Sequence, residues 1–296
     1  MLAIVIPYYK LAFFEETLES LASQTDKRFK VYIGDDASPE NPSELLEKYQ
    51  SKFDFVYHRF KDNLGSVSLV KQWDRCIAMT GDEEWLMILG DDDYLGNTVV
   101  ASWYENFSKF DDKANVVRFT CKLIIEGTES ILGPYTHPVW ESATDSFYRK
   151  FDKISRSSLS EYMFLKNIYE KHGFYNYPLA WNSDDRAWLD FSENKPIYTI
   201  DESLVYVRLS KLNITGMKNN MVLKDLSSVE FHNFIILNKL QYYSKYKRVK
   251  IIRKYHLELK KVKSLEIKDY CFLMRYYLIN INSRAIKEFF QKYLKT

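Results

Sequence analysis

The sequence predicts an α/β protein with a doubly wound, mixed sheet and a helical region appended at its C-terminal end. Two observations support this prediction. Short apolar runs alternate about four times with segments of helical apolar spacing, as strands and helices do in a doubly wound sheet. After Gly216, apolar and basic residues interleave at helical spacing, without Pro or Gly. We therefore expect an α/β domain over residues 1–216 and a basic helical region over residues 217–296.

The individual elements follow from local patterns. Residues 2–7 (LAIVIP) form a nearly continuous apolar run, which is typical of a buried strand. Within residues 13–24, Phe14, Leu18, Leu21 and Ala22 recur at helical spacing, and Asn41-Pro42 can cap and start the next helix. Further strands are predicted at 30–34, 53–59, 84–89, 115–125, 197–200 and 204–209, and further helices at 66–79 and 98–110.

Charge is unevenly divided along a chain whose net charge is only +2. Residues 1–216 contain 24 Lys and Arg against 34 Asp and Glu, whereas residues 217–296 contain 18 against 6. Such a basic region favours an anionic surface, either a membrane or a nucleic acid. The three cysteines form no disulfide framework and no close-spaced zinc motif, which fits a reducing cytosol. Because no leader-like segment and no run of about 18 apolar residues is present, we expect a cytoplasmic protein.

Three adjacent carboxylates, Asp91, Asp92 and Asp93, directly follow the predicted strand at 84–89. They repel one another, and such a cluster at a strand end is costly unless a cation or several N–H donors compensate its charge. Mg²⁺ or Mn²⁺ would prefer these oxygen ligands and would keep positions open for phosphate. The simpler interpretation is a solvated acidic loop, but the position after a buried strand favours a cation site.

Other polar residues fall at the ends of predicted strands. Asp35-Asp36 follows a short strand and could accept hydrogen bonds from a nucleotide, or could simply form a turn. Pro7-Tyr8-Tyr9 closes the first strand and could offer a ring to a base. Asn63-Leu64-Gly65 precedes a helix whose N-terminus would favour phosphate. Arg208 lies near the end of the last strand and could reach a phosphate or an acceptor.

Asp184-Asp185 is a candidate general base. A hydroxyl that attacks an anomeric carbon must lose its proton, and a carboxylate can take it. The neighbouring carboxylate would raise the pKa of one member of the pair. The alternative is that the pair caps a helix beginning near Arg186.

Taken in order, IVIPYY, GDDAS, NLG, LGDDD and SDD resemble the motif series of the family 2 glycosyltransferases of GT-A fold. The resemblance spans residues 1–216, and the order of the series carries it more than any single motif. It implies inverting transfer of a sugar from a nucleotide-sugar to a hydroxyl of a glycan or lipid-linked glycan, with UDP-sugars as the expected donors. Mn²⁺ or Mg²⁺ would be the cofactor, and bacterial surface polysaccharide synthesis the setting.

The resemblance also implies roles for individual residues. It implies nucleotide-sugar contacts by Pro7, Tyr8, Tyr9, Asp35, Asp36, Asn63, Gly65, Lys71, Asp91 and Arg208. It implies metal binding by Asp92 and Asp93, and a catalytic base at Asp185 beside Asp184. The sequence departs from the family pattern at Gly90, where a first carboxylate is usual, so the roles within the triplet stay open. Lys71 and Arg75 both remain candidates for an Arg that the family carries on its third helix.

The C-terminal region allows two interpretations. Residues 239–263 carry ten basic residues and one acid, with apolar and aromatic residues between them. Such a segment suits an anionic bilayer surface, and it equally suits helices that pack on the catalytic body or on a second subunit with Lys outward. Nucleic-acid binding is a weaker third interpretation, because no recognised module accompanies the charge.

Three other functions are alternatives to a glycosyltransferase. A nucleotidyltransferase would need a Gly-rich phosphate loop after the first strand, and residues 6–16 contain no Gly. A phosphatase or receiver with an Asp nucleophile would leave the carboxylate triplet unexplained. A degenerate transferase that binds a glycan or a protein partner without catalysis remains the main alternative, because Gly90 replaces a family carboxylate.

Overall fold

The structure is a computed structural model of the chain, and it describes residues 1–128 and 130–280. The chain divides into two compact units. Unit 1 comprises residues 1–176 and 183–217, and unit 2 comprises residues 177–182 and the chain from Lys218 onward. Residues 281–296, which the sequence analysis assigned to the helical region, lie outside the described part of the chain.

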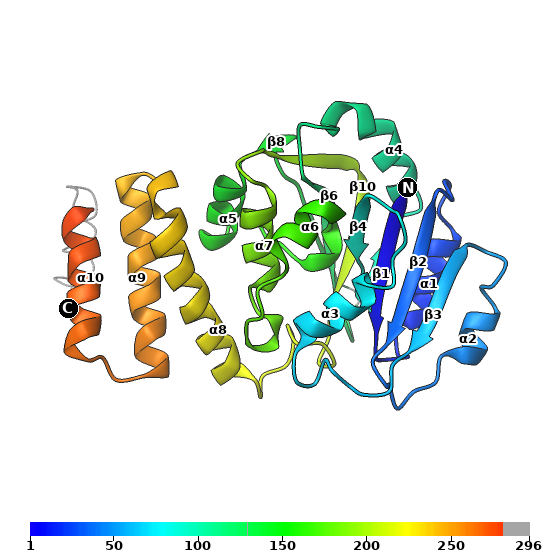
Figure 1. Cartoon of the computed structure of the whole chain (residues 1–296), viewed down its shortest axis with the longest axis horizontal. Coiled ribbons are helices and arrows are strands. Elements are labelled where there is room, and N and C mark those ends of the chain that lie inside the picture. The colour runs from blue at the N-terminus through cyan, green and yellow to red at the C-terminus, as the bar shows by residue number, and fades with distance from the viewer. Residues whose placement is uncertain (129, 281–296) are drawn as a thin grey trace. The chain divides into compact units, whose positions relative to one another are not determined.

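Unit 1 contains a mixed sheet with its helices (Figure 1). The strands are β1 (Leu2–Tyr8), β2 (Phe29–Asp35), β3 (Asp54–Arg59), β4 (Trp85–Ile88), β5 (Tyr94–Leu95), β6 (Val116–Ile125), β7 (Ile131–Tyr135), β8 (Trp140–Glu141), β9 (Tyr162–Leu165) and β10 (Ile197–Leu209). The helices are α1 (Phe14–Ala22), α2 (Ser43–Glu47), α3 (Leu69–Ile77), α4 (Val99–Phe110), α5 (Ala143–Phe151), α6 (Lys166–His172) and α7 (Ser183–Phe191).

The strands follow the order β3-β2-β1-β4-β9-β6-β10-β5, with β7 paired to β6 and β8 paired to β10. Strands β3, β2, β1 and β4 are mutually parallel. Strand β9 runs antiparallel between β4 and β6, and β6 is parallel to β10. The predicted α/β fold with a mixed sheet is therefore confirmed, and the parallel half places the carboxyl ends of β1, β2 and β4 at one edge.

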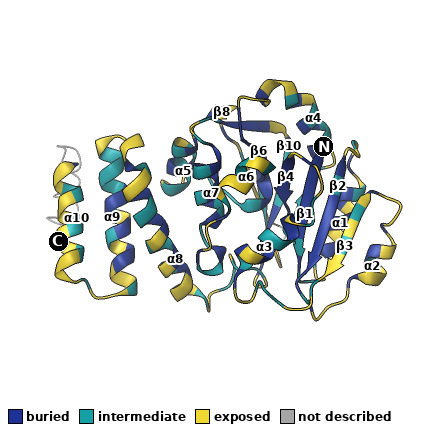
Figure 2. Cartoon of the chain, viewed as in Figure 1, coloured by how far each residue is buried: buried dark blue, intermediate teal, exposed yellow. Residues whose placement is uncertain are grey.

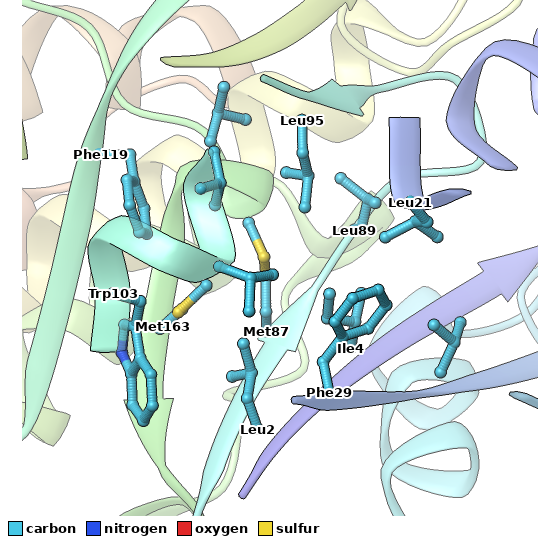
Figure 3. Close-up of a cluster of buried hydrophobic side chains, with 14 of the residues drawn as sticks. Leu2, Ile4, Leu21, Phe29, Met87, Leu89, Leu95, Trp103, Phe119 and Met163 are labelled. Atoms are coloured by element: carbon cyan, nitrogen blue, oxygen red, sulfur yellow. The ribbon is translucent and has the colours of Figure 1, made fainter. Parts of the chain in front are cut away.

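The apolar run of the first strand is buried on both faces, as expected of a central parallel strand. Leu2 and Ile4 belong to a core that also contains side chains of α1 and α4, such as Leu21 and Trp103 (Figure 3). The intervening residue Ala3 is equally inaccessible. Burial on both faces explains why this strand reads as a continuous apolar run rather than an alternating one.

Several features of the sheet differ from the prediction, including the short strands β5, β7 and β8, which were not predicted. Residues 197–200 and 204–209 were expected to form two short strands, but they belong to the single strand β10, whose pairing with β6 shifts in register between Ile200 and Leu204. The irregularity explains why the pattern looked interrupted. Strand β9 was missed because its apolar run, YMFL, is only four residues long and joins directly to α6.

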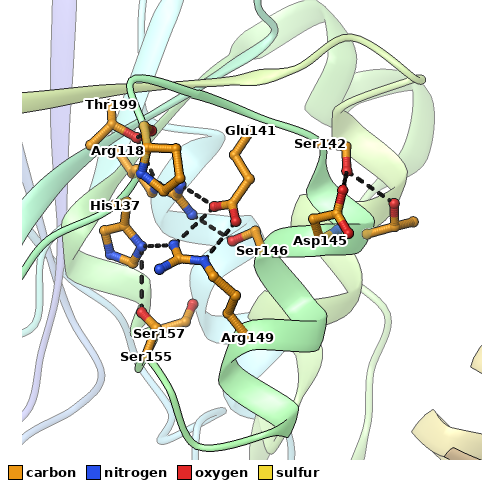
Figure 4. Close-up of polar contacts among 12 residues, drawn as sticks. Arg118, His137, Glu141, Ser142, Asp145, Ser146, Arg149, Ser155, Ser157 and Thr199 are labelled. Carbon is orange, nitrogen blue, oxygen red and sulfur yellow. Dashed lines mark hydrogen bonds and ion pairs between the residues drawn. The ribbon is translucent and has the colours of Figure 1, made fainter. Parts of the chain in front are cut away.

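A buried network of charged residues fixes α5 to the sheet (Figure 4). Arg118 of β6 is inaccessible, and its guanidinium pairs with Glu141 of β8 and donates to Thr199 of β10. Arg149 of α5 donates to the same Glu141 carboxylate and also contacts His137. Burial and the neighbouring guanidinium groups lower the pKa of His137 to about 2, so this imidazole is neutral. A buried charge is tolerated only when it is paired in this way, and the network therefore holds α5 in a defined position.

Unit 2 is helical. It contains α8 (Met221–Phe234), α9 (Lys245–Val262), α10 (Ile267–Ile279) and short helical turns between α8 and α9. His232 of α8 contacts Glu258, the one acid of α9, with 2.8 Å between Nδ1 and Oε2, and both side chains are buried. Ile251 and Ile252 are inaccessible, whereas much of α10 is exposed (Figure 2). Among the helices of residues 1–128 and 130–280, none has both the length and the apolar character needed to cross a bilayer.

Candidate active site

A cavity of about 470 Å³ opens at the carboxyl ends of β1, β4 and β10. Most of the predicted site residues line it, namely Pro7, Tyr9, Asp36, Asn63, Gly65, Asp91, Asp92, Asp93 and Arg208. The other predicted residues, Tyr8, Asp35, Lys71, Asp184 and Asp185, do not line it. The fold thus brings together residues that lie far apart in the sequence, at the edge where doubly wound sheets bind ligands.

The three carboxylates after β4 have different partners. Asp91 accepts hydrogen bonds from the backbone N–H groups of Tyr9 and Lys10, each at 2.8 Å, and so ties the end of β1 to the end of β4. Asp93 accepts from the Ser160 hydroxyl at 2.5 Å and from the Arg208 backbone N–H at 2.8 Å. These two residues therefore hold the site together. Asp92 accepts from the Asn213 side-chain amide at 3.2 Å, a longer contact.

The pKa values of the three carboxylates are raised above the ordinary value for Asp. Burial and the neighbouring Asp92 charge raise the pKa of Asp91 to about 6 and that of Asp93 to about 7. Burial also raises the pKa of Asp92, although Asn213, Lys10 and Arg208 act in the opposite direction. Raised pKa values mean that the protein alone does not fully compensate three negative charges in this cavity.

These residues fit a hard divalent cation in one specific way. In residues 1–128 and 130–280, no group of three or more His, Cys, Asp or Glu side chains is placed to hold a metal ion. Asp91 and Asp93 already accept two hydrogen bonds each from other residues, whereas Asp92 lines the cavity and accepts only the longer one from Asn213 beside that from its own backbone N–H. A cation held by one carboxylate must take its other ligands from water and from substrate phosphates, which is how Mg²⁺ is commonly bound.

Asp36 fixes the loop that contains Leu64 and Gly65. Its carboxylate accepts from the backbone N–H groups of Leu64 at 2.7 Å and Gly65 at 2.9 Å, and it pairs with Arg75. A Cβ atom at Gly65 would lie 2.5 Å from Asp36 Oδ2, so only glycine allows this approach. Of the two basic candidates on α3, Arg75 is the one that reaches the site, and Lys71 is exposed. The sequence analysis left this choice open.

Asp35 and Tyr8, both predicted to contact the nucleotide, are buried instead. Asp35 is inaccessible and accepts from Tyr57 at 2.6 Å, from Arg59 at 2.8 Å and from the Ser38 backbone N–H at 2.8 Å. Tyr8 is inaccessible too, with its hydroxyl donating to a backbone carbonyl at Glu40. Both residues shape the turn after β2 and lie outside the cavity.

Arg208 is predicted to bind a phosphate, but its guanidinium already interacts with other residues of the described part of the chain. Its Nε donates to the Asp92 backbone carbonyl at 3.0 Å, its guanidinium pairs with Glu16 at 2.5 Å, and it lies over the Phe13 ring at 4.1 Å. Lys10, which the sequence analysis did not single out, lines the cavity near Asp91 and Asp92. Its ammonium donates to a backbone carbonyl of the loop after β10, at Leu212.

Asp184 and Asp185 lie in the first turn of α7. Asp185 is buried and pairs with Lys150 of α5, at 2.6 Å between Oδ1 and Nζ. Burial lowers the pKa of Lys150, but the two carboxylates outweigh burial and raise it. Burial and the Asp185 charge raise the pKa of Asp184 to about 7. Near neutral pH Asp184 is therefore partly protonated, and the Lys150 ammonium partly balances the negative charge around it.

The acid pair and the cavity are linked by one chain segment. Asp185, Lys150, Tyr162 and Ser157 line a small pocket of about 10 Å³. Residues 158–160, which follow Ser157 directly, line the large cavity. This segment was not predicted because its serines carry no motif; its importance is shown by the Ser160 hydroxyl, which donates to Asp93 and accepts from the Gly90 backbone N–H.

Comparisons with known proteins agree with this architecture. The family model for glycosyl transferase family 2 matches residues 3–153. TarS 1–349 of S. aureus has a TM-score of 0.62 at 13% sequence identity, covering 96% of this chain and 82% of its own. The same TarS segment in complex with UDP-GlcNAc has a TM-score of 0.62 at 14% identity, with the same coverage. Another structure of S. aureus TarS also has a TM-score of 0.62, and this chain covers 50% of it.

A search of the curated proteins finds no match. The solved structures, at these low identities, show a shared fold, and the family match supplies the relationship itself. Its span of 151 residues begins in β1 and includes the whole carboxylate triplet and the Asp36 loop. Because this span is more than half of the 296 residues, the chain belongs to glycosyl transferase family 2.

Proposed function

We propose that the protein is a metal-dependent, inverting glycosyltransferase that moves a sugar from a nucleoside-diphosphate sugar to a hydroxyl of a glycan or lipid-linked glycan. The observation that carries the proposal is that Asp92, the end of β1 and Asp36 line one cavity. UDP-sugars are the proposed donors, since a TarS structure of the same fold contains UDP-GlcNAc. We propose bacterial surface polysaccharide synthesis, at the inner face of the plasma membrane, as the setting.

In this proposal Asp92 would hold Mn²⁺ or Mg²⁺ at the donor-binding cavity. When bound, such a cation would stabilise the negative charge that develops on the departing nucleoside diphosphate. Asp91 and Asp93 position Asp92 through their hydrogen bonds to the ends of β1 and β10. Lys10 supplies a further positive charge at the cavity, which would favour the diphosphate.

Asp185 is the proposed general base. An inverting transfer in a single step needs a carboxylate that takes the proton of the attacking hydroxyl. Lys150 holds Asp185 in one orientation through an ion pair, and burial together with the Asp185 charge raises the pKa of Asp184 to about 7. Acceptor binding would have to open the Lys150 pair, because Asp185 does not line the large cavity in this state.

Isothermal titration with UDP, with and without Mn²⁺, tests the nucleotide–metal site. We expect Mn²⁺ to strengthen UDP binding, and Asp92→Ala to remove that gain. Asp82→Ala is the matched control, because Asp82 is exposed and does not line the cavity. Mn²⁺-independent binding, equal in both variants, would contradict a metal role for Asp92. Binding of no nucleoside diphosphate at all would favour the alternative, a non-catalytic glycan- or partner-binding protein.

A further inference from the structure

The structure shows which apolar residues of the basic C-terminal region are buried and which are exposed to a partner. Ile251, Ile252, Tyr255 and Leu259 of α9 are buried within unit 2. Four apolar residues of α9 are thus covered within unit 2, whereas Leu257 of the same helix is 48% exposed. An apolar contact surface has to be sought elsewhere in the unit.

Helix α10 presents such a surface. Ile267 is 82% exposed, Tyr270 51%, Met274 60% and Leu278 61%, and Cys271 is exposed among them. These positions recur at intervals of three and four residues, so they form one stripe along the helix. The opposite side of α10, with Leu273, packs against α9. We call the five exposed residues the α10 stripe; Figure 2 shows how much of this helix is exposed.

Positive charge accompanies the stripe. Lys268 and Arg275, seven residues apart, lie along one flank of it and are exposed. Asp269 lies toward the packed side and pairs with Lys263. Over residues 218–280 the sequence carries 14 Lys and Arg against 5 Asp and Glu, a net charge of +9. An apolar stripe flanked by cations, on a strongly basic unit, is the pattern of a helix that lies in an anionic membrane interface.

We propose that the α10 stripe docks the protein on an anionic lipid bilayer, with Ile267, Met274 and Leu278 entering the headgroup boundary. The charge distinguishes this partner from a second copy of the chain, because two units of net charge +9 would repel each other across the same stripe. The inference deepens the proposed function, since it would place the active site at the surface that carries a lipid-linked acceptor. It does not depend on catalysis, however, and lipid binding is measured without any donor.

Cys271 provides a probe at the stripe itself. The other cysteines, Cys76 and Cys121, are buried, so a thiol-reactive, polarity-sensitive fluorophore should label Cys271 selectively in the native full-length chain. We expect a blue shift and brighter emission with vesicles of phosphatidylcholine mixed with phosphatidylglycerol, and no change with phosphatidylcholine alone. A blue shift that instead grows with protein concentration, without lipid, would overturn the proposal in favour of self-association. A thiol that resists labelling in the folded chain would overturn it too, because the stripe would then be covered by the chain itself.

A variant pair makes the test independent of the label. The triple variant Ile267→Ser, Met274→Ser, Leu278→Ser should sediment with the anionic vesicles at least about tenfold more weakly than the native chain. The matched control, Met221→Ser with Val222→Ser, removes exposed apolar residues of α8 in the same unit and should bind as the native chain does. Equal binding of all three proteins would overturn the proposal. UDP titration of the triple variant should remain normal, so a loss of lipid binding is distinguishable from a failure of the donor site.

Discussion

The side-chain amide of Asn213 donates a hydrogen bond to the carboxylate of Asp92, with 3.2 Å between Nδ2 and Oδ2. The same amide nitrogen donates to the Arg208 carbonyl at 2.6 Å, and the amide oxygen accepts from the Gly216 backbone N–H at 3.0 Å. Asn213 thus connects the loop after β10 to the proposed metal ligand. A cation on Asp92 would compete with this hydrogen bond, so metal binding and the conformation of the loop are expected to be linked.

Asn213→Asp should convert this contact into a second carboxylate ligand. A site with two carboxylates binds Mn²⁺ without help from phosphate oxygens, so we expect metal affinity in the absence of nucleotide to rise by about tenfold or more. The measurement is titration of Mn²⁺ followed by its electron paramagnetic resonance signal. Asn97→Asp, at an exposed position outside the cavity, is the control for added charge. Unchanged affinity in Asn213→Asp would mean that the metal does not sit beside Asp92.

Asp93 and Asp92 should differ in what they contribute to stability. Asp93 is buried and accepts from Ser160 and from the Arg208 backbone N–H, so Asp93→Ala leaves a buried donor without its acceptor. A loss of about 1–3 kcal/mol in the free energy of unfolding is expected, measured by urea denaturation. Asp92→Ala should cost much less, because its contact with Asn213 is long. A larger loss in Asp92→Ala than in Asp93→Ala would reverse the assigned roles.

The metal-free protein should lose stability as the pH rises from about 4 to 7. The folded-state pKa values of Asp91 and Asp93, about 6 and about 7, lie above the value of about 3.9 for unfolded Asp, so the folded state binds more protons in this range. Protonation of these two groups therefore stabilises the fold at low pH, and that contribution disappears as the pH passes through their folded pKa values. Melting temperatures measured across this range test the prediction.

Two comparisons isolate these groups from the rest of the chain. Asp93→Asn, a neutral mimic of the protonated acid, should show a flatter dependence of melting temperature on pH than the native protein. Mn²⁺ with UDP should raise the melting temperature more at pH 8 than at pH 5.5, since the cation would bind the charged form of Asp92. A native protein that gains stability over this range, with Asp93→Asn behaving identically, would disprove the assignment.

Asp185→Asn should remove transfer and preserve donor binding. The change keeps the shape of the side chain but removes the proton acceptor, and general-base catalysis contributes about 10²–10⁴-fold in rate. Transfer rates and UDP affinities measured on the same preparations check this expectation. Lys150→Met serves as a comparison, because it frees Asp185 from its ion pair without removing the carboxylate. Near-native transfer by Asp185→Asn, with a large loss in Asp184→Asn, would move the base to Asp184.

The elements that the sequence predicted well are those defined by local pattern. The apolar run of β1, the helical spacing of α1 and the carboxylates directly after β4 all depend on residues close together in the chain. The edge at which ligands bind then follows from the alternation of strands and helices. These features place Pro7, Asp36 and Asp92 around one cavity, as the structure does.

What the sequence could not predict depends on partners from distant segments. Asp35 looks like a nucleotide contact until Tyr57 and Arg59 of the neighbouring strand occupy its carboxylate. Asp93 looks like a second metal ligand until Ser160, 67 residues away, donates to it. The amino-acid sequence shows which side chains can be charged, but only the packed structure shows which of them already accept hydrogen bonds from distant residues.

We propose that Asp92 enables this cavity to activate a nucleotide-sugar. The most direct measurement is release of UDP from a panel of UDP-sugars, including UDP-GlcNAc, with Mn²⁺ present, compared between the native chain and Asp92→Ala. The account predicts that the native chain releases UDP from at least one donor, slowly with water and faster with an acceptor, and that Asp92→Ala does not. Equal release by the native chain and Asp92→Ala, or no release from any donor by a native chain that binds none of them, would contradict it.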